Sequence, residues 1–372
     1  MRIALWCDRE LADGLSAVFP DDLQIVCVID TNRGESAETA SHIPLVNFTQ
    51  FRKWYMDSVE AAFVCMGHGL ERMEAVRILQ YYGITNIGFP KLHRSFDVSP
   101  AGMVWTNGKP YLSQVEIHIM DSCNLNCSGC THFSNLFDGN QAYDITRFCA
   151  DLRMLSKRVL FSILYLLGGE PFLNPNLADY LYAARAILPD CDIILVTNGL
   201  LIPQQPDEVM EALRRTGIFV EISLYPPTAA IVDKIEERLE GTGVEFCIRA
   251  ERQEFMAFLG TKGTSDPEFS QSVCGNAFCR YVRNGRLYKC PVDALSYKYQ
   301  EKFHVNYPAS EGIDLYAEDF ERMLPLLDGP IQMCRYCEEN IRVFPWKVAK
   351  YPVKEDWFGL RDEKGEGIIN CK

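Results

Sequence analysis

Short apolar runs alternate with amphipathic stretches along most of this chain. Apolar runs of about four to eight residues are typical of buried strands, and apolar positions repeating about every three to four residues are typical of helices. The first part of the chain predicts strands at residues 3–6, 23–29, 59–66 and 84–89, with helices at about 10–18 and 70–82. Because strands and helices alternate, we expect a small doubly wound α/β sheet over residues 1–95.

A second and longer alternation follows residues 96–112, whose prolines and glycines predict a linker. It predicts strands at residues 115–120, 161–167, 192–197, 218–224 and 244–249, and helices at 146–157, 176–187, 207–216 and 228–239. Repeated right-handed βα units of this length are typical of a parallel barrel or an open portion of one. Such barrels place their active sites at the carboxyl ends of the strands, so the residues after each strand are the first candidates for chemistry.

Composition narrows the class of protein. The 372 residues carry 37 basic and 50 acidic side chains, a net charge of −13, and no long basic run, which argues against nucleic acid as a partner. No apolar stretch approaches the length of a membrane span, and charges begin too early for a signal peptide. The 15 cysteines indicate metal ligation in a reducing cytoplasm rather than disulfides. We therefore expect a soluble cytoplasmic protein without a membrane partner.

The predicted strand at 115–120 leads into a loop that carries Cys123, Cys127 and Cys130. Three thiolates at this spacing can hold three irons of a cubic iron–sulfur cluster and leave the fourth iron open for chemistry. The alternative is a set of buried or zinc-binding cysteines, with His132 as a possible fourth ligand.

A second motif follows the strand predicted at 161–167, which ends directly in Gly168-Gly169-Glu170-Pro171. Two glycines let the backbone approach a ligand closely, and the carboxylate beside them can receive an ammonium group. The CxxxCxxC loop after one strand and GGEP after the next together resemble the radical S-adenosylmethionine (radical SAM) superfamily. In many members an aromatic residue precedes the third cysteine, whereas this chain has Gly129 there.

This resemblance implies a fold, a cofactor and a reaction. The fold is a partial (β/α)6 barrel over residues 113–255, open on one side to admit substrate. The cofactor is S-adenosylmethionine, which chelates the open iron of a 4Fe–4S cluster while Gly168, Gly169 and Glu170, followed by Pro171, cradle its amino group. An electron from reduced flavodoxin or ferredoxin cleaves the cofactor to methionine and a 5′-deoxyadenosyl radical, which abstracts hydrogen from an unactivated carbon of the substrate.

Polar residues end two further predicted strands. Thr197, Asn198 and Ser223 could bond the ribose hydroxyls of the cofactor, or they could form turns and caps. In many members of the superfamily the fourth strand ends in Ser-Leu-Asp-Gly, whereas here Tyr225 replaces the acidic residue. Arg249 could reach a substrate carboxylate or phosphate, or it could form a surface salt bridge.

Four later cysteines lie within residues 256–345: Cys274, Cys290, Cys334 and Cys337. Gly285 predicts a hairpin between the first two of them. Their order resembles the auxiliary-cluster domains called SPASM and twitch, and the count fits twitch. The resemblance implies a second 4Fe–4S cluster, with Cys279 as a spare candidate ligand. A structural zinc ribbon is the alternative, because its CxxC pairs look the same. Residues 346–372 are expected to form a C-terminal tail.

The amino-terminal module departs from a nicotinamide-binding site. Asp30 ends the strand at 23–29, where a dinucleotide-binding fold places its ribose carboxylate. The turn after the first strand, however, reads Cys7-Asp8-Arg9-Glu10 and has no glycine to let the backbone approach a pyrophosphate. The module resembles the degenerate Rossmann-like domains of enzymes in surface-glycan and nucleotide-sugar pathways. We expect a docking or dimerising role and no NAD.

Three functional hypotheses follow. The first is oxidation of a small polar molecule, such as an alcohol or amine on a sugar or activated carrier, with the auxiliary cluster accepting the electron of the substrate radical. The second is radical modification of a ribosomal peptide, although the amino terminus lacks the winged-helix pattern that often captures leader peptides. The third is a non-catalytic metal-binding scaffold, against which the GGEP motif argues.

Overall fold

The computed structural model describes residues 1–15, 19, 22–30, 37–39, 42–65, 70–90, 103–139 and 141–359. The chain divides into two compact units. The first comprises Met1–Ser113 with Ser156–Ser162 and Asp190–Asp192, and the second comprises Gln114–Leu155, Ile163–Pro189 and Ile193–Lys372. Residues 96–102 of the predicted linker, and residues 360–372 of the predicted tail, lie outside the described residues. Within the described part of the chain, no helix is long and apolar enough to cross a membrane.

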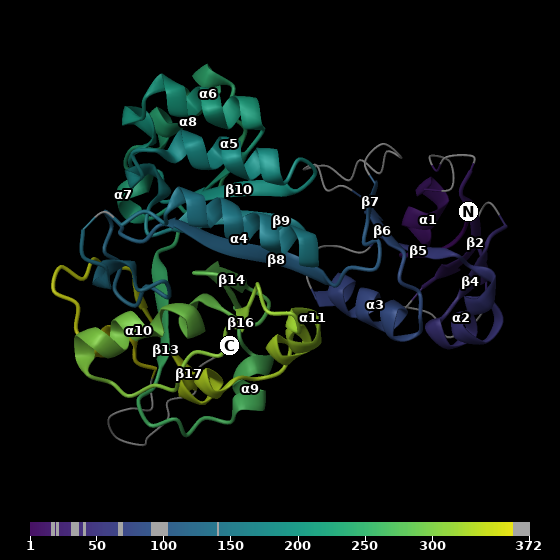
Figure 1. The fold of residues 1–372 in the computed structure, drawn as a ribbon. Helices are drawn as coiled ribbons and strands as arrows, with labels where there is room; N and C mark the ends of the chain where they lie inside the picture. The colour runs from purple at the N-terminus through teal and green to yellow at the C-terminus, as the bar shows by residue number, and fades with distance from the viewer. Residues whose placement is uncertain are drawn as a thin grey trace. The chain divides into compact units, whose positions relative to one another are not determined.

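The first unit is built on a seven-stranded sheet of order β3-β4-β2-β1-β5-β6-β7 (Figure 1). Its strands are β1 (Arg2–Trp6), β2 (Gln24–Ile29), β3 (Ala37–Glu38), β4 (Pro44–Val46), β5 (Ala61–Val64), β6 (Ile87–Pro90) and β7 (Met103–Trp105). Its helices are α1 (Arg9–Leu15), α2 (Phe48–Trp54) and α3 (Leu70–Tyr81). Strand β1 pairs in parallel with β2 and β5. The predicted alternation of strands and helices is therefore confirmed, while α2 and the short strands β3, β4 and β7 were not predicted.

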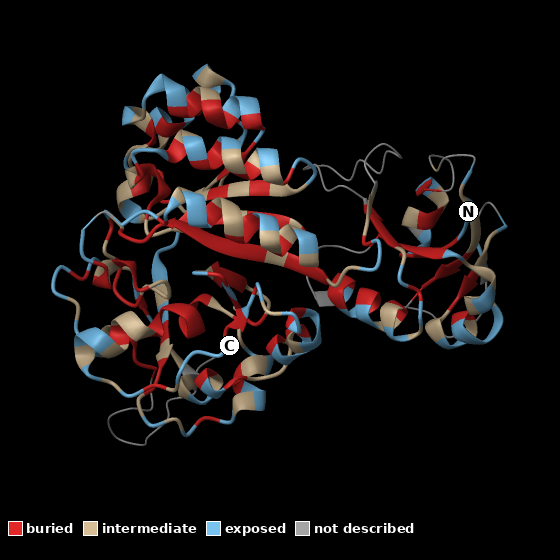
Figure 2. Cartoon of the chain, in the orientation of Figure 1, coloured by how far each residue is buried: buried red, intermediate tan, exposed pale blue. Residues whose placement is uncertain are grey.

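The second unit contains an eight-stranded sheet of order β12-β11-β10-β9-β8-β14-β15-β16. Its strands are β8 (Tyr111–Met120), β9 (Leu160–Gly168), β10 (Asp192–Thr197), β11 (Phe219–Ile222), β12 (Phe246–Ile248), β14 (Arg280–Arg283), β15 (Arg286–Tyr288) and β16 (Ile313–Asp314). A separate antiparallel pair consists of β13 (Glu254–Leu259) and β17 (Cys337–Pro345). Strand β8 is buried along almost its whole length because neighbours cover it on all sides (Figure 2).

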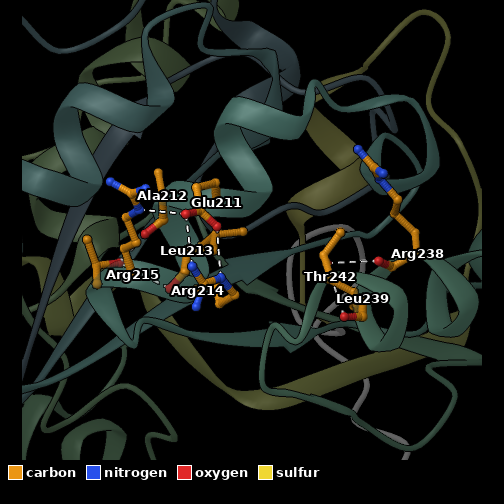
Figure 3. Close-up of polar contacts among 9 residues, drawn as sticks. Glu211, Ala212, Leu213, Arg214, Arg215, Arg238, Leu239 and Thr242 are labelled. Atoms are coloured by element: carbon orange, nitrogen blue, oxygen red, sulfur yellow. Dashed lines mark hydrogen bonds and ion pairs between the residues drawn. The ribbon is translucent and has the colours of Figure 1, made fainter.

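The second unit also contains helices, most of which follow one strand and precede the next along the chain. They are α4 (Ile145–Arg158), α5 (Leu177–Ile187), α6 (Asp207–Thr216), α7 (Pro226–Ala229), α8 (Val232–Thr242), α9 (Pro267–Ser272), α10 (Pro291–Phe303) and α11 (Phe320–Met323). Helix α6 shows why the local sequence folds this way. Acidic residues begin it, arginines end it, and Gly217 takes the left-handed backbone that closes a helix. On its exposed side Glu211 accepts hydrogen bonds from Arg214 and Arg215 (Figure 3).

The α/β class and the run of βα units from β8 to β12 are confirmed. Strands β10, β11 and β12 pair in parallel. The region predicted as a partial barrel contributes β8 to β12 to this sheet, and the other strands, β14 to β16, come from later residues. Strand β14 pairs in parallel with β8 and lies in the region predicted as the auxiliary domain. The predicted hairpin at Gly285 is confirmed, because β14 and β15 pair antiparallel and Asn284 and Gly285 both have positive φ. Residues predicted as barrel and as auxiliary domain thus share one sheet.

Candidate functional site

The loop after β8 carries the first three cysteines and turns tightly on itself. Asn126 and Gly129 both take left-handed backbone conformations, with φ of 51° and 71°. The thiols of Cys123, Cys127 and Cys130 lie near enough to influence one another's ionisation. Burial raises the pKa of Cys123 and of Cys127 to about 12, and the next largest contribution comes from the Glu170 carboxylate for Cys123 and from the Cys130 thiol for Cys127. A ligand that takes thiolates would therefore displace protons from this loop as it binds.

The C-terminal segment 346–357, expected to be a tail, returns across the second unit and holds this loop. Ser128 N donates to Lys347 O at 3.0 Å, Ala349 N donates to Asn126 O at 2.8 Å, and Cys127 forms an antiparallel bridge with Val348. Side chains add to this backbone pairing. Ser128 Oγ donates to Asp356 Oδ1 at 2.6 Å, Trp357 Nε1 donates to Cys130 O at 2.8 Å, and Trp346 Nε1 donates to Cys127 Sγ at 3.2 Å. Two tryptophans close together in a presumed tail were the available sequence signal.

Gly168 ends β9 and Gly169 follows it, at a place where two backbone segments approach each other closely. A Cβ atom on Gly168, whose φ is +155°, would lie 1.8 Å from Met120 O, and one on Gly169 would lie 2.1 Å from Ser122 O. Gly169 N donates to Met120 O at 2.8 Å, and Glu170 N donates to Ser122 O at 2.9 Å. Only glycine fits here, so the motif ties the end of β9 to the start of the cysteine loop.

Glu170 is fully buried, and the protein already occupies both of its carboxylate oxygens. Oε1 accepts from Thr197 Oγ1 at 2.7 Å and from Phe172 N at 3.0 Å, and Oε2 accepts from Asn198 N at 2.9 Å. Burial raises the pKa of this carboxyl to about 7. Glu170 thus positions the end of β10, and its contact with the amino group of a cofactor stays a prediction. Pro171 follows as the buried first residue of a short 3₁₀ turn.

Asn198 continues this chain of contacts to the cysteine loop. Its Nδ2 donates to Asn124 Oδ1 at 2.7 Å and lies 3.7 Å from Cys123 Sγ. Its Oδ1 accepts from Leu200 N at 3.0 Å. The ends of β8, β9 and β10 are therefore joined by hydrogen bonds into one polar rim.

A cavity of about 430 Å³ opens over this rim. Its lining includes the predicted residues Cys123, Cys127, Cys130, Gly168, Gly169, Thr197, Asn198, Ser223, Cys274 and Cys337. Glu170, Pro171, Cys290 and Cys334 are not part of the lining. Lining residues that the sequence did not single out include Glu221, Arg252 and Phe255. These residues lie on β11, on β13 and in the turn between β12 and β13. The sequence of these segments contains no motif that would have identified them.

Two histidines form a buried relay beside the cavity. Arg283 donates to both oxygens of Asp121 at 2.8 Å, and Asp121 Oδ1 lies 3.1 Å from His118 Nδ1. His118 Nε2 lies 2.8 Å from His132 Nδ1. Because the carboxylate only accepts, His118 carries its proton on Nδ1 and His132 donates to its Nε2. Burial lowers the pKa of His132 to about 3, so a neutral imidazole lines the cavity.

The later cysteines gather around a buried ammonium group. Cys274, Cys290 and Cys334 influence one another's ionisation, after burial, which is the first cause of their raised pKa values. Lys289 is buried and donates to Leu327 O at 2.9 Å and Gly329 O at 2.8 Å. It also lies within electrostatic range of all three thiols. A buried cation favours thiolate over thiol, so this donor set suits an anionic thiolate-bound group.

Three further residues were predicted as candidates for the site: Cys279, Cys337 and Arg249. Cys279 interacts with Cys274 and Cys290, but its Sγ also accepts from Gln114 Nε2 at 3.4 Å. Cys337 begins β17, opposite Leu259, and lines the cavity. Arg249 forms the surface salt bridge, to Glu221. Among the described residues, no group of three or more His, Cys, Asp or Glu side chains is arranged to hold a single metal ion.

Part of this chain is similar to a known family of proteins. Residues 117–251 match the model of the Radical SAM superfamily. The chain is 28% identical over 167 residues to GTP 3′,8-cyclase of Mycolicibacterium smegmatis, which covers 42% of this chain and 45% of that protein. It is 26% identical over 140 residues to GTP 3′,8-cyclase of Clostridium acetobutylicum, covering 35% and 44%. The chain thus spans less than half the length of these curated relatives.

Solved structures align with this chain at low sequence identity and low TM-score. SuiB of Streptococcus suis bound to S-adenosylmethionine aligns at 20% identity and a TM-score of 0.31, covering 38% of this chain and 34% of that one. BtrN in complex with AdoMet and 2-DOIA aligns at 15% identity and a TM-score of 0.40, covering 61% and 92%.

Proposed function

We propose that this chain, which carries a radical SAM superfamily domain over residues 117–251, is an enzyme that oxidises a small polar substrate, such as an alcohol or amine on a sugar or activated carrier. One observation carries the proposal. The cavity that is lined by Cys123, Cys127 and Cys130 is also lined by Cys274 and Cys337 of the later cysteine group. Both predicted cluster sites therefore face a space where a substrate could reach each of them.

The first cysteine group would hold a 4Fe–4S cluster, and the rim of strand ends would bind S-adenosylmethionine. When bound, these groups would supply a 5′-deoxyadenosyl radical that takes a hydrogen atom from the substrate. Thr197 Oγ1 donates to Glu170 Oε1 and accepts from Gly199 N, whereas Ser223 Oγ forms no hydrogen bond within the described part of the chain. Ser223, which lines the cavity, is therefore the best placed of the predicted cofactor-binding hydroxyls.

The later cysteine group would hold an auxiliary 4Fe–4S cluster through Cys274, Cys290, Cys334 and Cys337. Lys289 would balance its negative charge from within the protein core, which favours reduction of a group bound there. The auxiliary site would thus accept the second electron of a two-electron oxidation. We propose reduced flavodoxin or ferredoxin as the external electron donor and a cytoplasmic setting for the reaction.

Iron analysis tests this proposal. Protein reconstituted under anaerobic conditions should hold about eight irons per chain in two 4Fe–4S clusters. The triple variant Cys123→Ala/Cys127→Ala/Cys130→Ala should keep about four, because the later cysteines are untouched. Reduced wild-type protein should release 5′-deoxyadenosine from S-adenosylmethionine, and the triple variant should not.

Cys149 of α4 belongs to neither cysteine group, so Cys149→Ala serves as the control and should keep all the iron. Zinc in the wild-type protein, together with no iron in the triple variant, would contradict the second cluster. A wild-type protein that keeps iron but releases no 5′-deoxyadenosine would contradict the proposed chemistry.

A further inference from the structure

Trp346 lies in the C-terminal segment 346–357. Within the described residues, its indole forms the one side-chain hydrogen bond from this segment to a thiol of Cys123, Cys127 or Cys130. Its Nε1 donates to Cys127 Sγ at 3.2 Å. The donor comes from just beyond β17, and the acceptor comes from the loop after β8, 219 positions earlier in the chain. Tertiary structure alone brings them together.

The position of this indole is fixed from several sides. Trp346 N donates to Gln253 O at 2.8 Å, next to β13. The ring centroid lies 5.8 Å from that of Tyr225, which lines the cavity. The following residue, Lys347, accepts from Ser128 N at 3.0 Å. Backbone pairing on both sides and ring packing therefore hold the N–H toward sulfur without help from a ligand.

The chemistry of this contact gives it a consequence beyond packing. Indole Nε1 can only donate, and a thiolate sulfur keeps lone pairs when it ligates a metal. A hydrogen bond to a ligating sulfur withdraws negative charge from it and stabilises the more negative, reduced state of the cluster. The reduction potential then lies higher than it would without the donor.

We propose that Trp346 raises the reduction potential of the iron–sulfur cluster ligated by Cys127, through its N–H···S hydrogen bond. This inference rests on the proposed function, because it requires that Cys127 ligate a cluster. Trp346 acts through Cys127 and is thus a positioning and tuning residue. It eases delivery of the first electron from outside.

Trp357 offers a matched comparison within the same segment. Its Nε1 donates to Cys130 O, at 2.8 Å, and its side chain is buried against Phe133 and Tyr299. Both tryptophans thus tie the C-terminal segment to the cysteine loop, but only Trp346 donates to sulfur. If both tryptophans had a purely structural role, replacing either one should affect the midpoint potential of the cluster equally. If Trp346 tunes the cluster, only its replacement should shift that potential.

The test measures the reduction midpoint potential of the full-length reconstituted protein by redox titration followed by electron paramagnetic resonance. The signal component that changes when S-adenosylmethionine is added identifies the first cluster. Trp346→Phe should keep its iron and shift this midpoint to a more negative value. Trp357→Phe, with its iron retained, should leave the midpoint at the wild-type value.

If Trp346→Phe loses iron, site-specific replacement of Trp346 by 3-benzothienylalanine keeps the ring shape and removes only the N–H. A negative shift in that protein supports the inference. An unchanged midpoint in an iron-retaining variant that lacks the N–H overturns it, as does an equal shift in Trp357→Phe. A wild-type protein with no S-adenosylmethionine-responsive cluster would instead overturn the proposed function on which the inference rests.

Discussion

Glu116 lies within β8 with its side chain buried, and no hydrogen bond reaches its Oε2 from the described residues. Burial raises the pKa of this carboxyl from 4.5 to about 7. Below pH 4.5, the pKa of the group in the unfolded chain, the carboxyl is protonated in both states and makes no pH-dependent contribution to stability. As pH rises from 4.5 toward about 7, the unfolded chain ionises first, so the folded state loses relative stability. Above that range the loss is constant.

Glu116→Gln should therefore stabilise the protein at high pH relative to low pH. The raised pKa corresponds to about 3 kcal/mol in the free energy of unfolding, which the amide removes because it never ionises. Urea unfolding at about pH 5 and about pH 8 measures the difference. Glu240→Gln, at an exposed position on α8, is the control and should show no such dependence on pH. A gain for Glu116→Gln that is equal at both pH values would contradict the assignment.

Helix α4 acts as a clamp for the hairpin of β14 and β15. Asp151 is fully buried on its inner face. Its carboxylate accepts from Tyr143 Oη at 2.5 Å, from Tyr316 Oη at 2.7 Å and from Gly285 N at 2.7 Å, and Arg147 Nε lies 3.0 Å away. The carboxylate thus joins a helix that was predicted from its periodicity to a turn that was predicted from its glycine. Glu211 of α6 makes comparable contacts with two arginines, but at the surface (Figure 3).

Asp151→Asn should destabilise the second unit by about 2–4 kcal/mol, because an amide nitrogen would face donors that need an acceptor. Glu211→Gln should leave the thermal midpoint unchanged, since exposed ion pairs contribute little. Thermal unfolding of both variants beside the wild-type protein measures the contrast. Similar midpoints for Asp151→Asn and the wild-type protein would show that α4 does not clamp the hairpin.

At the scale of the whole molecule, the first unit is an α/β sheet for which the sequence predicts no nicotinamide cofactor, and the turn after β1 bears on that prediction. Asp8 Oδ1 accepts from Leu11 N at 2.9 Å and so occupies the start of α1 with a carboxylate. Asp30 is buried at the end of β2, and both carboxylates contribute to the raised pKa of Cys7, after burial. Negative charge thus gathers where a pyrophosphate would need backbone donors and positive potential.

The full-length protein should therefore bind no NADH. Carboxylates near α1 would repel the phosphates, and no glycine-rich turn offers backbone donors in their place. Isothermal titration calorimetry with NADH should give no binding heat, while S-adenosylmethionine added to the reconstituted protein serves as the positive control. Tight NADH binding would point to an oxidoreductase with two different cofactors.

The sequence by itself determined the features that depend on neighbouring residues. The apolar run at 192–197 became β10 with the same bounds, and the periodic stretch at 146–157 became α4 within a residue at each end. Gly285 formed its hairpin. Each follows from local backbone preference and from burial of one face, which a short window of sequence records. The loop of Cys123, Cys127 and Cys130 follows β8, and Gly168 ends β9, so both motifs stand at strand ends as the local pattern predicted.

Only the tertiary structure decided which distant segments meet. Gly168 and Gly169 face the backbone of Met120 and Ser122, so their need for small size comes from the close approach of the end of β8 and the loop after it, which no motif displays. Trp346 and Trp357 reach the cysteine loop from 219 and 227 positions away. Strand β14 joins β8 rather than following β12. Such contacts depend on how whole elements pack, and packing leaves no periodic trace in the residues that it brings together.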